Sequence, residues 1–189
     1  PVMTVIGTGH RAKLKDIKER CPNLDLLGIN AYAAIVEVPD WLNEFGWDKP
    51  FAVTEWGPSG WWEVPRTKWS VVIEETSTEK AARYRERYER VIRGDPRCIG
   101  SYVFLWTSNR QERTHTWFNM FHDNLKTQTV EVMQYMWTNT WPDNLAPRIA
   151  SLTLNQQRAV EHIALSPGAI GRAEIVATHP DGDELNLSW

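Results

Sequence analysis

The sequence predicts an α/β fold built from parallel βα units, and two observations support this. Four short apolar runs alternate with segments of helical character: residues 2–6, 24–32, 51–54 and 99–106. Strands that alternate with helices are typical of parallel sheets. The runs are continuously apolar rather than alternating, as expected of strands that are covered on both faces.

Polar and aromatic residues gather where these runs end. Asn30, Tyr32, Glu55 and Trp106 each stand at or just after the end of a run. A (β/α)8 barrel and a doubly wound sheet both place their functional residues at the carboxyl ends of their strands. Because no GxGxxG or Walker loop is present, a nucleotide-binding sheet is the weaker alternative, and no cofactor is expected.

The helices between the runs begin and end at recognisable signals. They are expected at residues 12–20, 38–45, 76–93 and 129–137. Thr76 and Glu79 form the capping-box pattern at the start of the third helix. Gly94 and Pro96 close that helix. The long loop before it, at 57–76, is rich in Trp and Pro, and loops of this length are usually functional.

Three parts are expected along the chain. Residues 1–142 carry the βα pattern, and residues 143–148 form a linker marked by Pro142 and Pro147. Residues 149–189 contain short strand-like runs separated by turn residues. We expect this last part to be the beginning of a β-sandwich module that is itself incomplete.

Composition excludes several classes of function. The net charge is −3 over 189 residues, and the basic residues of the third helix are interleaved with acidic ones, so no nucleic-acid partner is expected. No run reaches the roughly 18 apolar residues that a membrane span needs. Cys21 and Cys98 stand far apart without metal-ligand spacing, so they indicate neither a metal site nor a redox compartment.

The chain has 11 tryptophans, and several of them follow Glu55 closely: Trp56, Trp61, Trp62 and Trp69. Core packing accounts for about half of the tryptophans, because indole is a large group to leave exposed. Sugar rings present flat C–H faces that stack on indole, while their hydroxyls need polar partners. Tryptophan-rich loops that also carry acidic residues therefore favour a carbohydrate ligand.

Three segments together carry a family pattern: Leu-Gly-Ile-Asn-Ala-Tyr at 27–32, Pro-Phe-Ala-Val-Thr-Glu-Trp-Gly-Pro at 50–58 and Gly-Ser-Tyr-Val-Phe-Leu-Trp at 100–106. They resemble the last three barrel strands of clan A glycoside hydrolases, most of all the family 2 type barrel, with some similarity to β-1,3-glucanosyltransferases. The resemblance covers residues 1–142 and implies the C-terminal half of a (β/α)8 barrel. It also implies a carbohydrate substrate and favours an extracellular or periplasmic parent protein.

The resemblance implies that Glu55 is the nucleophile of a retaining glycosidase. In clan A the nucleophile ends the seventh strand, which is the position of Glu55, and the acid/base residue ends the fourth, typically as Asn-Glu. If residues 2–6 are the fifth strand, the fourth lies upstream, and Asn43-Glu44 falls inside a predicted helix. Because retaining hydrolysis needs both carboxyl groups, the activity of this chain by itself stays open.

Two residues from the neighbouring strand are expected beside Glu55. Tyr32 could donate a hydrogen bond to Glu55, or it could be a core tyrosine with a satisfied hydroxyl. Asn30 could bind a sugar hydroxyl or hold Tyr32. Glu55 itself has an alternative as a buried carboxylate that holds an arginine.

Aromatic residues are expected to contact the sugar. Trp106 could form the floor beneath the sugar that is cleaved. Trp56, Trp61 and Trp62 could shape further subsites, and packing within the core or the loop is their alternative. Glu63 on the same loop could also shape a subsite, but a surface residue or one that fixes the loop is the preferred interpretation.

The tail carries a second resemblance. Residues 177–185, which contain His-Pro-Asp-Gly-Asp, are similar to the DPDGD stretch of cadherin-like sandwich repeats. By that resemblance Asp181 and Asp183 could ligate Ca²⁺ through their oxygens. A plain Asp-Gly turn explains them as well and is the preferred interpretation.

Several functions stay open at this point. The chain could belong to a glycosidase or to a β-glucan transglycosylase, it could bind carbohydrate without catalysis, or it could be a fragment that is inactive alone. Half a barrel leaves an open sheet edge at each end of its strand set, so self-association or pairing with another chain is expected.

Overall fold

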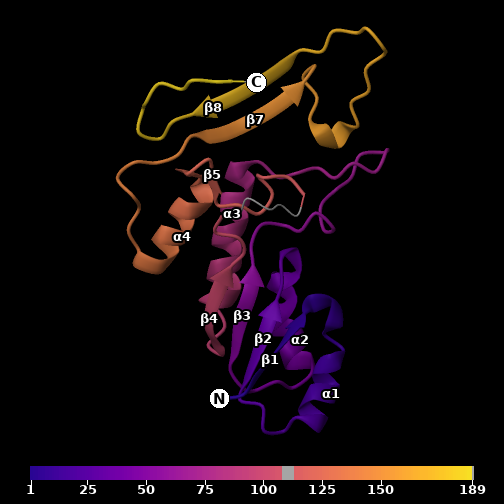
Figure 1. The fold of residues 1–189 in the computed structure, drawn as a ribbon, viewed down its shortest axis with the longest axis vertical. Coiled ribbons are helices and arrows are strands. Elements are labelled where there is room, and N and C mark those ends of the chain that lie inside the picture. The colour runs from indigo at the N-terminus through magenta and orange to yellow at the C-terminus, as the bar shows by residue number, and fades with distance from the viewer. Residues whose placement is uncertain (108–112, 189) are drawn as a thin grey trace.

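The computed structural model of the chain describes residues 1–107 and 113–188. A four-stranded sheet forms its centre (Figure 1). Its strands are β1 (Met3–Gly7), β2 (Leu26–Asn30), β3 (Phe51–Trp56) and β4 (Cys98–Val103). They pair in chain order and all run parallel. The predicted α/β fold is confirmed, and this strand order is the order found in half of a (β/α)8 barrel.

Helical segments connect the strands. They are η1 (Thr8–His10), α1 (Lys13–Arg20), η2 (Ala33–Glu37), α2 (Val38–Glu44), α3 (Ser77–Arg87), the π-helical turn η3 (Tyr88–Ile92) and α4 (Gln128–Thr138). The Thr76 hydroxyl accepts from the Glu79 amide and the Glu79 side chain accepts from the Thr76 amide, so the predicted capping box is confirmed. None of the described helices is long and apolar enough to cross a membrane.

The core lies between one face of the sheet and the helices. Leu27, Ile29 and Val53 are fully buried on that face. They belong to one buried cluster with apolar residues of the helical segments: Leu14, Ile35, Val38, Leu42, Tyr84 and Val91. On the other face Met3 and Val5 of β1, which is an edge strand, are about half exposed. The expectation that both faces are covered is therefore wrong for this edge strand.

The C-terminal part forms antiparallel pairs. β5 (Phe121–His122) pairs with β6 (Leu125–Lys126), and β7 (Arg148–Leu154) pairs with β8 (Ala173–Thr178), with η4 (Ala159–Glu161) between the last two. Figure 1 shows β7 and β8 beyond the N-terminal end of α3, far from the N-terminus of the chain. The Ile149 amide donates to the Thr78 hydroxyl at 2.8 Å, which ties β7 to the start of α3.

The expected further strand at 185–189 is absent over residues 185–188, and Trp189 lies outside the described residues. The segment 143–147 carries no helix or strand, as expected of a linker. One antiparallel pair does not make a two-layer module, so the β-sandwich and the boundaries at 142 and 149 stay predictions.

Candidate active site

Glu55 stands near the carboxyl end of β3, where the pairing with β2 is irregular. Ile29 pairs with Val53. The next pair is Asn30 with Glu55, so Thr54 is an extra residue on β3. A β-bulge of this kind re-aims the side chains that follow it. The side chains of Thr54 and Glu55 accordingly both reach Asn30.

Two neutral donors hold the Glu55 carboxylate. The Tyr32 hydroxyl donates to Oε1 at 2.6 Å, and Asn30 donates from Nδ2 to Oε2 at 3.2 Å. The Thr54 hydroxyl donates to Asn30 Oδ1 at 2.7 Å, which orients the amide so that its nitrogen faces Glu55. Hydrogen bonds to an ionised acceptor are short and strong. The network therefore fixes the carboxylate without neutralising its charge.

Glu55 forms no ion pair with any described residue, so no described arginine supports the alternative in which Glu55 holds one. The buried Arg87 of α3 is used elsewhere. It donates from Nη1 to the Gly57 carbonyl at 2.7 Å and from Nη2 to the Ser59 hydroxyl at 2.9 Å. Arg87 thereby anchors the beginning of the segment after β3, residues 57–75, which we call the aromatic loop.

The aromatic loop brings Trp62 to Tyr32. The two rings meet edge to face, with centroids 5.3 Å apart, and Trp62 is 49% exposed. Gly60 makes this placement possible, because a Cβ there would lie 2.5 Å from the indole. An indole that is packed along one edge and half exposed can still stack on the apolar face of a sugar ring.

Trp61 packs within the same loop. Its ring stands edge-on to Trp62 with centroids 5.4 Å apart. The Arg113 guanidinium lies 5.3 Å from the Trp61 ring centroid, a cation–π contact. Trp61 thus links the aromatic loop to the segment after β4.

The prediction that Trp56 contacts substrate is corrected by its burial. Trp56 is 0% exposed, and its ring lies 5.2 Å from Tyr84 and 6.2 Å from Tyr88, centroid to centroid. The bulge at Thr54 turns Glu55 towards Asn30 and so turns the next residue into the core. Trp56 is therefore a core residue.

Trp106 lies apart from the rings around Tyr32. It is 53% exposed and packs on Phe121, with centroids 4.9 Å apart. Within the described residues, no ring contact joins Trp106 to Tyr32 or Trp62. Its role as a floor beneath the sugar stays a prediction.

Sequence reasoning missed two phenylalanines that pack on Tyr32. Phe118 lies 5.3 Å from the Tyr32 ring and Phe104 lies 6.3 Å from it, centroid to centroid. Phe104 stands at the end of an apolar run, so its position was a usable signal. Phe118 is held at the site by backbone bonds on either side of Leu105, whose amide donates to the Phe118 carbonyl at 3.1 Å and whose carbonyl accepts from the Met120 amide at 3.1 Å, contacts that no spacing in the sequence indicates.

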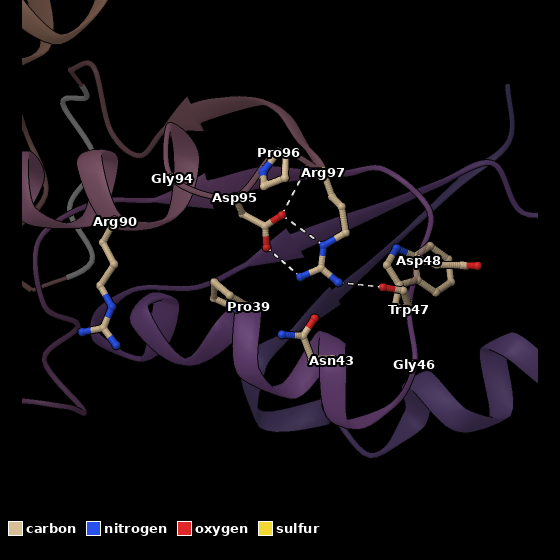
Figure 2. A pocket seen from close by; sticks show the side chains of 10 residues that line it. All are labelled: Pro39, Asn43, Gly46, Trp47, Asp48, Arg90, Gly94, Asp95, Pro96 and Arg97. Atoms are coloured by element: carbon tan, nitrogen blue, oxygen red, sulfur yellow. Dashed lines mark hydrogen bonds and ion pairs between the residues drawn. The ribbon is translucent and has the colours of Figure 1, made fainter.

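A cavity of about 670 Å³ lies at the opposite, N-terminal edge of the sheet. Figure 2 shows the Arg97 guanidinium facing the Asp95 carboxylate, with Trp47 beyond it. Arg97 donates to both Asp95 oxygens, at 3.0 and 2.7 Å, and to the Trp47 carbonyl at 2.8 Å. The hydrogen bonds from Arg97 lower the pKa of Asp95. The ion pair at this edge is interpreted as a support for the fold, since functional residues in parallel α/β folds lie at the carboxyl edge of the sheet.

The tail residues proposed for Ca²⁺ form a turn. Gly182 has a φ of 82°, and its amide donates to the His179 carbonyl at 3.1 Å. One ligand atom each of His179, Asp181 and Asp183 lies within 4.8 Å of the others. Imidazole is a poor ligand for Ca²⁺, so the donor set fits that ion only through the two aspartates. The Asp181 carboxylate already accepts from the Leu145 amide at 2.6 Å.

No family model and no curated protein matches the sequence. Solved structures do match. A β-glucuronidase from Ruminococcus gnavus in complex with D-glucuronic acid is 12% identical with a TM-score of 0.49, over 72% of this chain and 26% of that chain. A GH113 β-1,4-mannanase, solved as a complex, is 15% identical with a TM-score of 0.47, over 72% and 45%. The chain thus spans about a quarter of the glucuronidase and less than half of the mannanase. At these values nothing about activity follows.

Proposed function

We propose that this chain carries the catalytic nucleophile of a retaining glycosidase that acts on β-linked carbohydrate, and that Glu55 is the nucleophile. The observation that supports this most is the setting of the Glu55 carboxylate. It lies at the carboxyl edge of a parallel sheet, is held by Tyr32 and Asn30, and has no ion pair among the described residues. A carboxylate that is fixed and still charged has what a nucleophile needs.

The chemistry has two steps. A Glu55 oxygen bonds to the anomeric carbon while the bond from that carbon to the leaving oxygen breaks, and a general acid protonates that oxygen. A water then attacks the anomeric carbon, gives its proton to the same acid/base residue, and releases Glu55. A sugar hydroxyl in place of water gives transglycosylation, so both outcomes use the same carboxylate.

The other site residues have supporting roles in this proposal. Tyr32 donates to Glu55 and keeps it oriented, and Asn30 holds the second carboxylate oxygen. Trp62 offers a half-exposed ring next to Tyr32 for a sugar, and Trp61 supports Trp62 from within the loop. Trp106 extends the binding surface beyond them.

The general acid must be another carboxyl group. Glu63 is the next acidic residue along the chain, but its two oxygens already accept three backbone N–H groups. We expect the acid about 5 to 5.5 Å from Glu55 across the glycosidic bond. The resemblance to clan A enzymes implies that it belongs to a strand outside the described residues.

The test uses an inhibitor that needs no general acid. Dinitrophenyl 2-deoxy-2-fluoro-β-glycosides have a leaving group that departs without protonation, and the fluorine slows release of the enzyme-bound sugar. We expect a panel of these compounds to label the chain by one sugar unit, with the label on the peptide that contains Glu55, and Glu55→Gln to abolish it. A label on a different carboxylate would refute the assignment.

Carbohydrate binding without catalysis is the second candidate, and the exposed tryptophans favour it. Trp62, Trp69 and Trp106 are each about half exposed. Under this alternative, oligosaccharide affinity survives Glu55→Gln and no fluoroglycoside labels the chain. Affinity without labelling, both in the isolated chain and in its parent protein, would replace the first proposal with this one.

A further inference from the structure

We infer that Glu63 is a positioning residue, which holds the aromatic loop against the segment after β2 and so sets Tyr32 and Trp62 beside Glu55. The importance of this arrangement for catalysis rests on the proposed function. The contacts that Glu63 makes, and the geometry that it controls, do not.

The Glu63 carboxylate joins two segments that are about 30 residues apart in the chain. Its Oε2 accepts from the Ala33 amide at 2.9 Å and from the Gly60 amide at 2.8 Å. Its Oε1 accepts from the Ala34 amide at 3.3 Å. The Glu63 amide also donates to the Gly60 carbonyl at 2.8 Å, which closes a tight turn around Trp61 and Trp62.

Two of these donors lie at the start of a helical segment. η2 begins at Ala33 and runs directly into α2. The first N–H groups of a helix have no partner within it, and negative charge is favoured there. The side chain of Tyr32, the residue before η2, does not cap this end of the helix. Glu63 supplies the missing acceptors from a distant part of the chain.

The residues that contact Glu55 and the sugar are direct neighbours of this junction. Tyr32 precedes Ala33, and Trp62 precedes Glu63, so each ring is one residue away from an anchored atom. The two rings meet at 5.3 Å, and the Tyr32 hydroxyl then reaches Glu55 at 2.6 Å. Loss of the junction would free both rings together.

The same loop contains a matched control. The Glu75 carboxylate accepts from the Ser59 amide at 3.2 Å and from Arg83 at 3.2 Å, so it also fastens the aromatic loop, but to α3. Within the described part of the chain it makes no hydrogen bond to residues 33–34. Glu75→Gln therefore weakens the loop without touching the junction with η2.

The experiment compares Glu63→Gln and Glu75→Gln in the full chain by NMR. Glu63→Gln keeps one acceptor oxygen, which in the place of Oε2 can still accept from Ala33 and Gly60, but its side-chain nitrogen then faces the Ala34 amide and the negative charge at the start of η2 is lost. We expect Glu63→Gln to remove the cross-peaks between the Tyr32 and Trp62 rings and to speed hydrogen exchange of the Ala34 amide about tenfold or more. Glu75→Gln should retain the cross-peaks and the slow exchange.

Retained cross-peaks in Glu63→Gln, or an equal loss in both variants, would overturn the inference. If Glu63→Gln does not fold, exchange in the unsubstituted chain decides, because the Ala33 and Gly60 amides should be protected although neither donates to a backbone carbonyl of the described residues. Hydrogen exchange of these two amides at the rates of an unstructured chain would refute the positioning role of Glu63. None of these measurements involves a sugar, so a failure to label Glu55 would leave the positioning role standing.

Discussion

At the N-terminal edge of the sheet, Asp95 and Arg97 form an ion pair, whereas at the carboxyl edge the Glu55 carboxylate accepts from the neutral side chains of Tyr32 and Asn30 and has no ion pair among the described residues. A bidentate ion pair of this kind stabilises the fold where it stands. A fixed but unpaired carboxylate contributes little to folding and remains available to a ligand. Under the proposed function, one edge of the sheet supports the fold and the other carries the chemistry, which is the division expected of barrel folds.

The largest effect is expected at the carboxyl edge. Glu55→Gln should lower turnover of an aryl β-glycoside by about 10⁴-fold, because it removes the attacking oxygen. The free energy of unfolding should change by less than about 1 kcal/mol, since Gln still accepts the Tyr32 hydroxyl. Kinetics and urea unfolding, in whichever form turns over the glycoside, check both numbers. Turnover that survives in this variant would show that Glu55 is not the nucleophile and that the carboxyl edge does not differ from the N-terminal edge in this way.

Asp95→Asn should do the reverse at the N-terminal edge. It leaves Arg97 without its charged partner, so we expect a loss of about 1 to 3 kcal/mol in the free energy of unfolding. Turnover should not change, because the ion pair lies at the other edge of the sheet. Urea titration at neutral pH measures the loss. An Asp95→Asn variant as stable as the natural chain would show that the ion pair between Asp95 and Arg97 does not stabilise the fold.

The pH dependence sharpens the same contrast. Arg97 lowers the pKa of Asp95 in the folded chain, below the value of about 3.9 in an unfolded one. The stabilisation is therefore complete above about pH 5 and is lost as the pH falls through the folded value. The stability difference between the natural chain and Asp95→Asn should shrink when urea titrations are repeated at acidic pH. A difference that stays constant would exclude the ion pair as its source.

Tyr32→Phe is expected to have a smaller effect on turnover. It removes a hydrogen bond to a charged acceptor, which corresponds to a loss of about tenfold to a hundredfold. The packing of the ring against Phe118 remains, so stability should change little. Tyr102→Phe is the control, because Tyr102 is exposed on β4. Equal turnover losses in the two variants would remove Tyr32 from the site.

The smallest expected effect concerns sugar affinity. Trp62→Ala should weaken oligosaccharide binding by about three- to tenfold, the scale of a single aromatic contact. Trp69→Ala is matched to it, because Trp69 is 48% exposed on the same loop but contacts Lys68 rather than Tyr32. Calorimetry on both variants measures the difference. A larger loss in Trp69→Ala would move the sugar surface away from Glu55.

Much of the fold could be predicted because its signals are local. Continuous apolar runs, the capping box at Thr76 and Gly94 at the end of the same helix depend on neighbours in the chain, and each lies where it was expected. The need for glycine at position 28 is also local to the sheet, because a Cβ there would lie 2.8 Å from the Val5 side chain and 3.0 Å from the Thr54 side chain. The identity of this residue follows from strand packing rather than from any ligand.

The orientation of the site residues could not be predicted in the same way. Strict alternation from Val53 would point Glu55 into the core and Trp56 out of it. The bulge at Thr54 reverses both, which is why the prediction for Trp56 was wrong. The sequence indicates that Glu63 fixes its own loop, as the contact with Gly60 does, but its contacts with Ala33 and Ala34 join segments far apart in the chain, and a single sequence holds no signal for those.

The Trp62 indole occupies the space that a side chain at position 60 would fill. The two positions are therefore steric alternatives: alanine at 60 would displace the ring, and a small residue at 62 would leave a hollow that alanine at 60 could occupy. Libraries designed to alter sugar preference should vary positions 60 and 62 together. Alanine at position 60 alone would displace the Trp62 ring, so that any change in preference would reflect this displacement.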